Sequence, residues 1–430
     1  MGHNVFLTGF AGSGKTFLLN EYIAFLRKND VEVGVTASTG IAATHMEGRT
    51  IHSWAGMGIN AEMTKPEIRK VLRKAHIKKR IASTRVLIID EISMLGHRQL
   101  DLVDAICRLG KKQNIPFGGM QIILSGDFFQ LPPINKSLEE GENKFATESD
   151  VWGELDMKIC YLDEQFRQSD KVFSQVLNDI RDDKVTVDTV NTLMSRLNVD
   201  IGDEIIPTKL NTHNAAVDAI NNRELAKLKT KPVAFEMDST GSPNVIETLK
   251  KGCLAEESIT LKEGAAVMFV KNNYIKGYVN GTLGTVIDFG KEEGWPIVET
   301  SSGKRIVAEP ESWGVEEDGE VIARVDQVPL RLAWAISVHK SQGMSLESAE
   351  IDLSRAFERG MGYVALSRVR SLDGIRLTGI NNTALEVNKD VVGLNREFII
   401  RSQSDTDELR EFGEKKINKF QQDFIKEARS

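Results

Sequence analysis

Short apolar runs alternate with longer stretches of helical spacing over the first third of the chain. The runs are Val5–Thr8, Val31–Ala37, Arg85–Asp90 and Gln121–Gly126, and the stretch Phe17–Leu26 follows the first of them. Strands separated by helices are typical of a parallel sheet in an α/β domain. The N-terminal part of the chain is therefore predicted to be an α/β domain built on a parallel sheet.

The pattern changes after Trp152. Helical spacing runs from Lys171 to Leu197 and returns in a segment that ends at Leu228. From about residue 232 to residue 326, short β-like runs alternate with glycine, asparagine and aspartate. Regular short strands separated by turn residues favour a small β-barrel, inserted here into a second α/β domain.

Sheet and helix patterns resume at Val328 and continue to Leu377. The tail from Leu409 to Phe424 carries apolar residues near helical spacing, which predicts a packing helix. The stretch Lys65–Arg80 interrupts the rhythm of the first domain and is predicted to be a small insertion of helix and loop.

The composition limits the class of protein. A chain of 430 residues is too long for one ordinary core, and 41% hydrophobic with 27% charged residues is typical of a globular protein. The three cysteines show no CxxC spacing, which argues against a disulfide framework or a zinc site. No apolar run approaches about 18 residues and the start is no signal peptide, so we expect an intracellular protein without a membrane partner.

The charge is unevenly distributed. The net charge of −7 argues weakly against a nucleic-acid partner, but nine Lys and Arg residues fall between Lys65 and Arg85 against the single acid Glu67. Phosphate contacts depend on local charge, so the distribution matters more than the sum. From this run alone, a solvated helix face and a nucleic-acid contact remain equally good interpretations.

A complete phosphate-binding loop with the pattern GxxxxGK[ST] follows the first predicted strand and opens a helix. Its glycines let backbone N–H groups point at phosphates, Lys15 supplies a charge for the β and γ oxygens, and Thr16 supplies a hydroxyl for Mg²⁺. The pattern predicts binding of ATP with magnesium. The residues expected to hold the nucleotide are Gly9, Gly12, Ser13, Gly14, Lys15 and Thr16.

Two further segments supply catalytic candidates. Asp90 and Glu91 end a buried strand, which suits Asp90 for the metal and Glu91 for deprotonating the attacking water. Downstream, Gln130 could hydrogen-bond the γ-phosphate or the water, and Asp127 could support the same loop through its backbone. Taken alone, these segments are a solvated strand end and a turn, but the phosphate loop favours the catalytic interpretation.

The order of the motifs resembles that of Pif1-like helicases of superfamily 1B, a group that includes the phage Dda helicase and bacterial RecD2-type enzymes. The resemblance runs from Gly9 to about Gly374. Its most specific segments are Asp90–Met94, Gly126–Pro133, Ser337–Gly343 and Tyr363–Arg368, and the stretch Leu95–Arg108 is similar to a signature of the family.

The resemblance implies an α/β fold with two RecA-like domains. Domain 1A would span residues 1–160, with an insertion 1B at about 56–84. Domain 2A would span 161–231 and 327–430, interrupted by an SH3-like β-barrel, 2B, at 232–326. The resemblance also implies that Arg167 and Arg368 reach the γ-phosphate from the second domain, and that Gly343 contacts the nucleotide.

The implied activity is that of a 5′→3′ DNA helicase, acting as a monomer in replication, recombination or repair. Its implied partners are single-stranded DNA and forked or structured DNA, with G-quadruplexes among them. Hydroxyls, imidazoles, a backbone amide beside glycine and a lysine can hold phosphates without reading bases. The implied DNA-binding residues are Thr36, Ser38, Thr39, Gly40, His52, Trp54, His213, Asn214, His339, Lys340 and Ser341.

For Trp54, stacking on a base and burial in the core are equally good interpretations. Two departures from the family also stand out. Only eight residues precede Gly9, where the family has a helix whose glutamine reads adenine, so base selectivity is in doubt and the chain could be truncated. Met361 stands where glutamine is expected, which could loosen a contact with the nucleotide or a neighbouring loop.

Three alternative functions remain open on the sequence. One is a translocase that displaces proteins from single-stranded DNA with little unwinding. Another is a nucleotide-gated DNA-binding module with little turnover, against which Glu91 and Gln130 argue. A small-molecule phosphotransferase is the third, and the segment Ser337–Gly343 leaves it little room.

Overall fold

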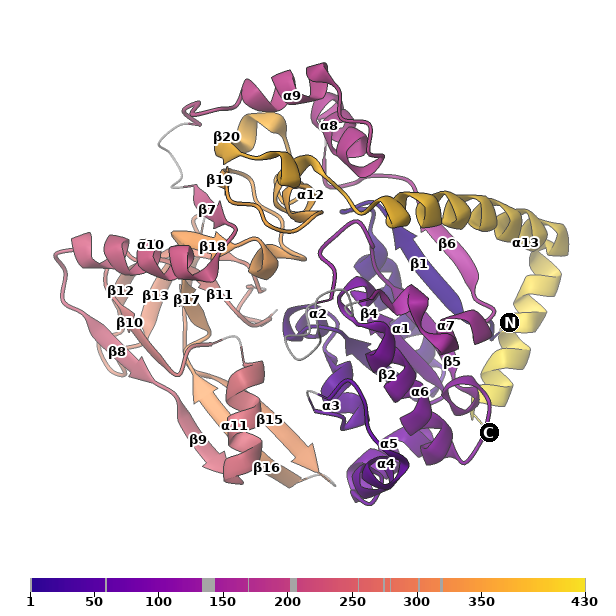
Figure 1. The fold of residues 1–430 in the computed structure, drawn as a ribbon. Helices are drawn as coiled ribbons and strands as arrows, with labels where there is room; N and C mark the ends of the chain where they lie inside the picture. The colour runs from indigo at the N-terminus through magenta and orange to yellow at the C-terminus, as the bar shows by residue number, and fades with distance from the viewer. Residues whose placement is uncertain are drawn as a thin grey trace. The chain divides into compact units, whose positions relative to one another are not determined.

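The chain forms two compact units (Figure 1). The computed structural model describes residues 2–58, 60–133, 144–168, 170–201, 207–253, 255–273, 275–278, 280–300, 302–317 and 320–429. The first unit consists of residues 1–167, 181–183 and 387–430, and the second of residues 168–180 and 184–386. The expected boundary at 160/161 thus falls a few residues before the observed division, and the end of the expected domain 2A belongs to the first unit.

A six-stranded parallel sheet with the order β3-β2-β4-β5-β1-β6 forms the centre of the first unit. The predicted parallel α/β domain is therefore confirmed. Every residue of β4 is buried, as its continuous apolar run requires. The strands are β1 (Val5–Gly9), β2 (Val33–Ala37), β3 (Arg49–Thr50), β4 (Val86–Asp90), β5 (Gln121–Ser125) and β6 (Lys158–Leu162).

Helices pack around this sheet. One side chain cluster joins Leu19, Ile23 and Leu26 of the first helix to Val35 and Ile88 of the strands. The α-helices are α1 (Lys15–Lys28), α2 (Gly40–His45), α3 (Ile51–Ala55), α4 (Lys65–Val71), α5 (Ala75–Ser83), α6 (His97–Lys111), α7 (Asp150–Glu154) and α13 (Lys389–Arg429). Short 3₁₀ turns lie at η1 (Ile92–Met94), η2 (Pro116–Gly119) and η3 (Ala146–Glu148).

The basic stretch forms α4 and α5. Glu67 accepts hydrogen bonds from the Thr64 amide and hydroxyl in a capping box that starts α4. Ile68, Val71, Ile77 and Ile81 are buried, while most of the cations between them are exposed. The predicted helical insertion is therefore present, and its charged face points to solvent.

The helix α13 covers the free edge of β6 in the first unit. The Ile159 amide donates to Asp405 Oδ2 at 2.8 Å, and the Tyr161 amide donates to Ser402 Oγ at 3.0 Å. An edge strand with unpaired amides is prone to pairing with other chains, so these side chains protect it. The predicted packing helix is part of this element, which starts at Lys389 and kinks at Gly413.

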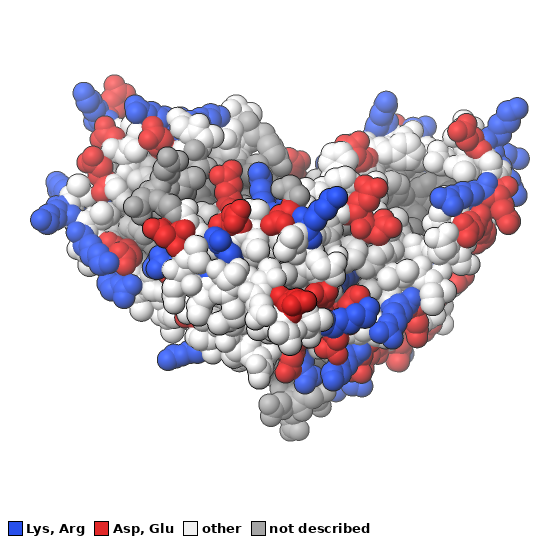
Figure 2. All heavy atoms as spheres, turned by 90° about the horizontal axis from the view of Figure 1, so that it is seen from above, with Lys and Arg blue, Asp and Glu red and all other residues white. Residues whose placement is uncertain are grey.

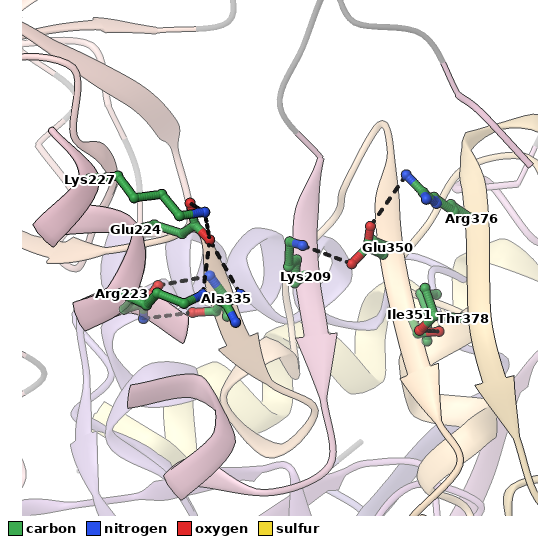
Figure 3. Close-up of polar contacts among 10 residues, drawn as sticks. Lys209, Arg223, Glu224, Lys227, Ala335, Glu350, Ile351, Arg376 and Thr378 are labelled. Atoms are coloured by element: carbon green, nitrogen blue, oxygen red, sulfur yellow. Dashed lines mark hydrogen bonds and ion pairs between the residues drawn. The ribbon is translucent and has the colours of Figure 1, made fainter. Parts of the chain in front are cut away.

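A four-stranded parallel sheet with the order β18-β7-β19-β20 lies in the second unit. Its strands are β7 (Thr208–Asn211), β18 (Ala335–Ser337), β19 (Ala349–Leu353) and β20 (Ile375–Ile380). Figure 3 shows Glu350 between Lys209 and Arg376, at 2.9 and 3.6 Å. These residues are directly opposite one another on β7, β19 and β20, so the ion pairs favour the observed register.

Helices and 3₁₀ turns accompany this sheet. Asn221 exchanges hydrogen bonds with the Ala335 amide and carbonyl, which fixes α10 against β18. The α-helices are α8 (Lys171–Arg181, whose last residue belongs to the first unit), α9 (Val187–Met194), α10 (Asn214–Lys227), α11 (Pro243–Gly252) and α12 (Met361–Leu366). The turns are η4 (His339–Ser341), η5 (Leu372–Gly374) and η6 (Asn382–Leu385).

Antiparallel strands fill the segment where a barrel was predicted. The sheet β14-β13-β12-β11-β17 and the pair β10-β8 share a core that includes Phe269, Val286 and Val298, and a further sheet has the order β15-β16-β9. These strands are β8 (Val233–Glu236), β9 (Asp238–Gly241), β10 (Ser258–Leu261), β11 (Ala266–Phe269), β12 (Leu283–Phe289), β13 (Pro296–Thr300), β14 (Arg305–Val307), β15 (Glu311–Glu317), β16 (Glu320–Gln327) and β17 (Leu330–Leu332). The fold class, with two parallel sheets and an antiparallel insertion, is confirmed.

Candidate functional site

The phosphate loop joins β1 to α1 in the first unit. Gly12 and Gly14 have φ of 78° and 88°, in the left-handed region that glycine adopts without strain. A Cβ on Gly12 would lie 2.5 Å from Cβ of Arg167, and one on Gly9 would lie 2.1 Å from the Leu162 carbonyl oxygen. The loop therefore requires glycine for its backbone conformation and for close packing, and it leaves the first amides of α1 for an anion.

Lys15 lies over its own loop. Its Nζ donates to the carbonyl oxygens of Gly9 at 3.1 Å and Phe10 at 2.8 Å. Burial lowers the pKa of Lys15, and the negative charges of Asp127 and Glu91 partly oppose that shift. Ser13 Oγ is buried without a hydrogen-bond partner among the described residues. A lysine on weak carbonyl partners and an unsatisfied buried hydroxyl fit a loop that accepts phosphate oxygens.

The two expected carboxylates lie at the end of β4. Asp90 is 5% exposed, and Glu91 has φ of 52°, a conformation that costs energy for any residue but glycine. The Ser38 hydroxyl donates to the Glu91 carbonyl at 2.7 Å, and the Ser38 amide donates to the Asp90 carbonyl. The ends of β2 and β4 are thereby joined, so Ser38 lies beside the predicted catalytic pair.

Gln130 lies in a tight turn after β5. Its amide donates to the Asp127 carbonyl at 3.0 Å, and the Phe129 amide donates to Asp127 Oδ1 at 3.2 Å. The predicted role of Asp127 as a backbone support for this loop is therefore confirmed. Gln130 is 6% exposed, and its Oε1 is buried without a partner in the described part of the chain. This oxygen is available for a ligand.

Arg181 also belongs to this site, although no sequence motif includes it. Its side chain is 1% exposed, and Nη1 donates to both carboxylate oxygens of Asp127 at 2.7 Å. Its guanidinium carbon lies 4.8 Å from the Phe10 ring centroid and 4.2 Å from that of Phe129. A single arginine at the end of a predicted helix has no motif, and only the fold reveals its contacts.

The structure corrects the expectation for Arg167. This residue belongs to the first unit, where its side chain packs against Gly12, and it was expected to reach the nucleotide from the second domain. The Phe166 amide donates to the Gly12 carbonyl at 3.1 Å, which fixes this segment on the phosphate loop. The Phe166 ring is 73% exposed beside the same loop.

Arg368 lies in the second unit and is 2% exposed. It donates to the Val364 carbonyl at 2.9 Å and to the Ser367 hydroxyl at 2.8 Å. Gln342, next to Gly343, is 7% exposed, and both of its amide atoms are buried without partners among the residues described here. Met361, the departure from the family pattern, is fully buried in α12.

Of the expected DNA-binding residues in the first unit, two are unavailable. Thr36 is fully buried and its hydroxyl donates to the Ile88 carbonyl at 2.6 Å, because it lies inside a central strand. Trp54 is 2% exposed, because α3 turns its apolar face into the core, so the core interpretation is the one observed. Ser38, Thr39, Gly40 and His52 are partly exposed.

In the second unit, His213 and Asn214 are exposed, and His339 and Lys340 are partly exposed. Ser341 is fully buried and its hydroxyl donates to the Val338 carbonyl, so it cannot contact DNA directly as expected. Phe357, which sequence reasoning missed, is 53% exposed. Its ring centroid lies 4.9 Å from that of His213 and 6.2 Å from that of His339.

These three rings follow three neighbouring strands. His213 follows β7, His339 follows β18 and Phe357 follows β19, at the carboxyl edge of the parallel sheet where ligands of such sheets bind. Polar groups accompany them, including Asn214 and Lys340. The arrangement is an aromatic platform (His213, Phe357 and His339) that could stack on unpaired bases.

Other site types find little support within the described ranges. No cluster of three or more His, Cys, Asp or Glu residues there could hold a metal ion. None of the helices searched in the same ranges is both apolar enough and long enough to cross a bilayer. On the face drawn in Figure 2, blue Lys and Arg atoms are interspersed with red Asp and Glu atoms over the described residues.

Comparisons with known proteins identify the family of this chain. Residues 1–191 match the model of the PIF1-like helicase family, and residues 244–289 match that of the DNA helicase Pif1 2B domain. The ATP-dependent DNA helicase Pif1 of a Psychrobacter species is 42% identical over 92% of this chain and 69% of its own.

Solved structures are similar over almost the whole chain. The Pif1 helicase from Candida albicans is 36% identical with a TM-score of 0.79, covering 92% of this chain and 96% of its own. A Bacteroides Pif1 helicase in complex with ADP-AlF3 and ssDNA is 30% identical with a TM-score of 0.67, covering 92% and 94%. The family and structural matches together show that this chain belongs to the Pif1-like helicases.

Proposed function

We propose that this chain is an ATP-dependent 5′→3′ DNA helicase that moves along single-stranded DNA. The observation that carries the proposal is the phosphate loop. There, Lys15, the unsatisfied Ser13 hydroxyl and the unsatisfied Gln130 oxygen accompany the carboxylates of Asp90 and Glu91. The Psychrobacter relative is named an ATP-dependent DNA helicase, and the Bacteroides Pif1 helicase was solved with ADP-AlF3 and single-stranded DNA.

Magnesium fits the donors at the loop. The Thr16 hydroxyl and the Asp90 carboxylate are the hard oxygen ligands that Mg²⁺ takes beside phosphates, and such an ion would neutralise developing charge. In this proposal Lys15 turns from the Gly9 and Phe10 carbonyls to the β and γ oxygens. Glu91 orients the attacking water and takes its proton, and Gln130 holds the water or the γ-phosphate.

The two arginines of the family pattern would complete hydrolysis. Arg167 is positioned by packing on Gly12 of the phosphate loop. Arg368 of the second unit would act on the same γ-phosphate when ATP is bound, and Gly343 would contact the nucleotide. Such arginines contribute about 10³–10⁵ in rate where measured. Alternation between the ATP-bound and the nucleotide-free state would then move two sets of DNA-binding residues relative to each other.

The exposed and half-exposed residues among the expected DNA-binding set would make these contacts with DNA. In the first unit they are Ser38, Thr39, Gly40 and His52, whose hydroxyls, amide and imidazole suit phosphates. In the second unit they are Asn214 and Lys340 together with the aromatic platform. Stacking on a base contributes about 1–3 kcal/mol and tolerates any sequence, as a motor that moves along DNA requires.

Forked or structured DNA, including G-quadruplexes, would be the substrate in replication, recombination or repair inside the cell. Separating an average base-pair step costs about 1.4 kcal/mol of stacking, so one ATP per base is sufficient. We propose that a monomer performs this reaction. Sedimentation of the protein with a short single strand tests the monomer, which a 2:1 complex would contradict.

Strand separation on duplexes with a single tail tests the proposal. With ATP and magnesium, the protein should separate a duplex tailed at the 5′ end and leave one tailed at the 3′ end intact. The matched control is Glu91→Gln, which should bind both substrates and separate neither. Separation from the 3′ tail alone would contradict the direction. Displacement of a bound protein without any strand separation would favour the translocase.

A further inference from the structure

Arg181 connects four segments of the first unit. Besides Asp127, its guanidinium contacts the Tyr161 hydroxyl at 3.3 Å and Asn395 Oδ1 at 3.5 Å. Tyr161 belongs to β6 and Asn395 to α13, while Phe10 belongs to the phosphate loop. Arg181 lies outside every segment that resembles the family motifs. A side chain enclosed in this way is held in one conformation.

The pair with Asp127 is buried on both sides. Asp127 is fully buried and Arg181 is 1% exposed. Two buried charges are tolerated only when each finds a well-placed opposite charge and further hydrogen bonds, and removal of one partner leaves the other uncompensated. Asp127 accepts from Arg181 and from the Phe129 amide, so its orientation depends on this arginine.

The guanidinium touches both loops that face the nucleotide. Its stacking partner Phe10 has the carbonyl that accepts from Lys15, and its other partner Phe129 immediately precedes Gln130. Desolvation lowers the pKa of Lys15, the negative charge of Asp127 opposes that shift, and the positive charge of Arg181 adds to it. Without Arg181, the uncompensated Asp127 would compete with phosphate oxygens for Lys15.

We propose that Arg181 is a positioning residue for ATP hydrolysis. It holds Asp127 and Phe129 so that Gln130 faces the γ-phosphate, and it neutralises Asp127 so that Lys15 remains available to the nucleotide. Arg181 is the last residue of α8 and belongs to the first unit, as do Asp127 and Gln130. This inference rests on the proposed ATPase function.

Steady-state ATP hydrolysis with and without single-stranded DNA tests the inference. For Arg181→Gln, kcat with DNA should fall about 10- to 100-fold, as expected for a displaced catalytic group, while KM for ATP changes less. Arg181→Lys keeps the charge and should recover part of kcat. The double variant Asp127→Asn with Arg181→Gln removes both charges and should recover more than Arg181→Gln alone.

The matched control is Arg108→Gln. Arg108 forms a second arginine pair in the same unit, with Asp104 at 2.6 Å and Glu154 at 2.7 Å, and neither partner belongs to the nucleotide loops. This control should lower Tm and leave kcat within about twofold. Full kcat in Arg181→Gln would overturn the inference. If Arg181→Gln does not fold, full kcat in both Arg181→Lys and the double variant would overturn it instead. A wild-type protein without DNA-stimulated hydrolysis would instead overturn the proposed function.

Discussion

At the residue scale, the phosphate loop depends on backbone conformations that only glycine adopts without strain. Gly12 combines a φ of 78° with close packing on Arg167, while Gly9 packs on the end of β6. The second functional feature at this scale is the aromatic platform, in which an exposed Phe357 ring contacts two histidines. Both features make predictions for single substitutions.

Gly12→Ala should weaken nucleotide binding. The left-handed conformation alone costs a non-glycine residue about 1–2 kcal/mol, and the new Cβ would displace Arg167 from the loop. We expect the Kd for a non-hydrolysable ATP analogue, measured by calorimetry, to rise at least about tenfold. Gly153→Ala is the control, because nothing lies within 4 Å of its added Cβ. An unchanged Kd for Gly12→Ala would contradict the proposal that the phosphate loop binds the nucleotide.

Phe357→Ala should weaken binding of single-stranded DNA by about 1–3 kcal/mol, the usual contribution of one stacked base. Fluorescence anisotropy with a labelled oligonucleotide measures the effect. Phe17→Ala serves as the control, since that ring is 71% exposed on α1 of the first unit and outside the platform. Equal losses for the two variants would show that the platform contributes nothing specific.

At the element scale, α13 completes the first unit although it lies at the other end of the chain. Its side chains satisfy two edge amides of β6, and Phe398 packs 4.9 Å from the Phe6 ring centroid. Farther along, Ile425 and Ala428 join the core cluster of the first sheet. The helix therefore protects an edge and extends a core.

Asp405→Ala should destabilise the first unit. The substitution leaves the Ile159 amide without its acceptor and removes the 3.0 Å ion pair with Lys158, at a cost of about 1–3 kcal/mol. We expect a lower Tm by calorimetry and faster aggregation on warming. Asp407→Ala, on the exposed side of the same helix, should change Tm little. Identical melting of the two variants would argue against edge protection.

At the scale of the whole molecule, each unit contains a half-buried histidine. Burial lowers the pKa of His52 in the first unit and of His339 in the second below the ordinary value of 6.5. The unfolded chain therefore binds more protons than the folded one as the pH falls below about 6.5. Their contribution to stability is complete above that pH and is lost below it.

Tm should accordingly decline as the pH falls from 7.5 to 5.5, and the decline should be shallower in His52→Gln and in His339→Gln. Calorimetry across this range measures both slopes. The exposed His3 provides the control, since His3→Gln should retain the wild-type slope. A wild-type slope in both His52→Gln and His339→Gln would contradict the assignment of acid sensitivity to these imidazoles.

The sequence predicted the parallel sheets and the phosphate loop because periodicity and local motifs determine them. The sequence did not predict features that depend on contacts between residues far apart along the chain. The pairing of Arg181 with Asp127 spans 54 residues, and the platform brings a residue after β7 next to residues that follow β18 and β19 much farther along the chain. Thr36, Trp54 and Ser341 matched family motifs, yet their side chains serve the core, because a motif position does not specify exposure.

In the proposed mechanism, hydrolysis of the nucleotide bound by the phosphate loop would require Arg368. DNA-stimulated ATP hydrolysis by Arg368→Gln tests it most directly, with folding checked by Tm and the exposed Arg370→Gln as control. We expect kcat to fall by about 10³-fold or more in Arg368→Gln and to stay near wild type in the control. Full hydrolysis by a folded Arg368→Gln protein would contradict it.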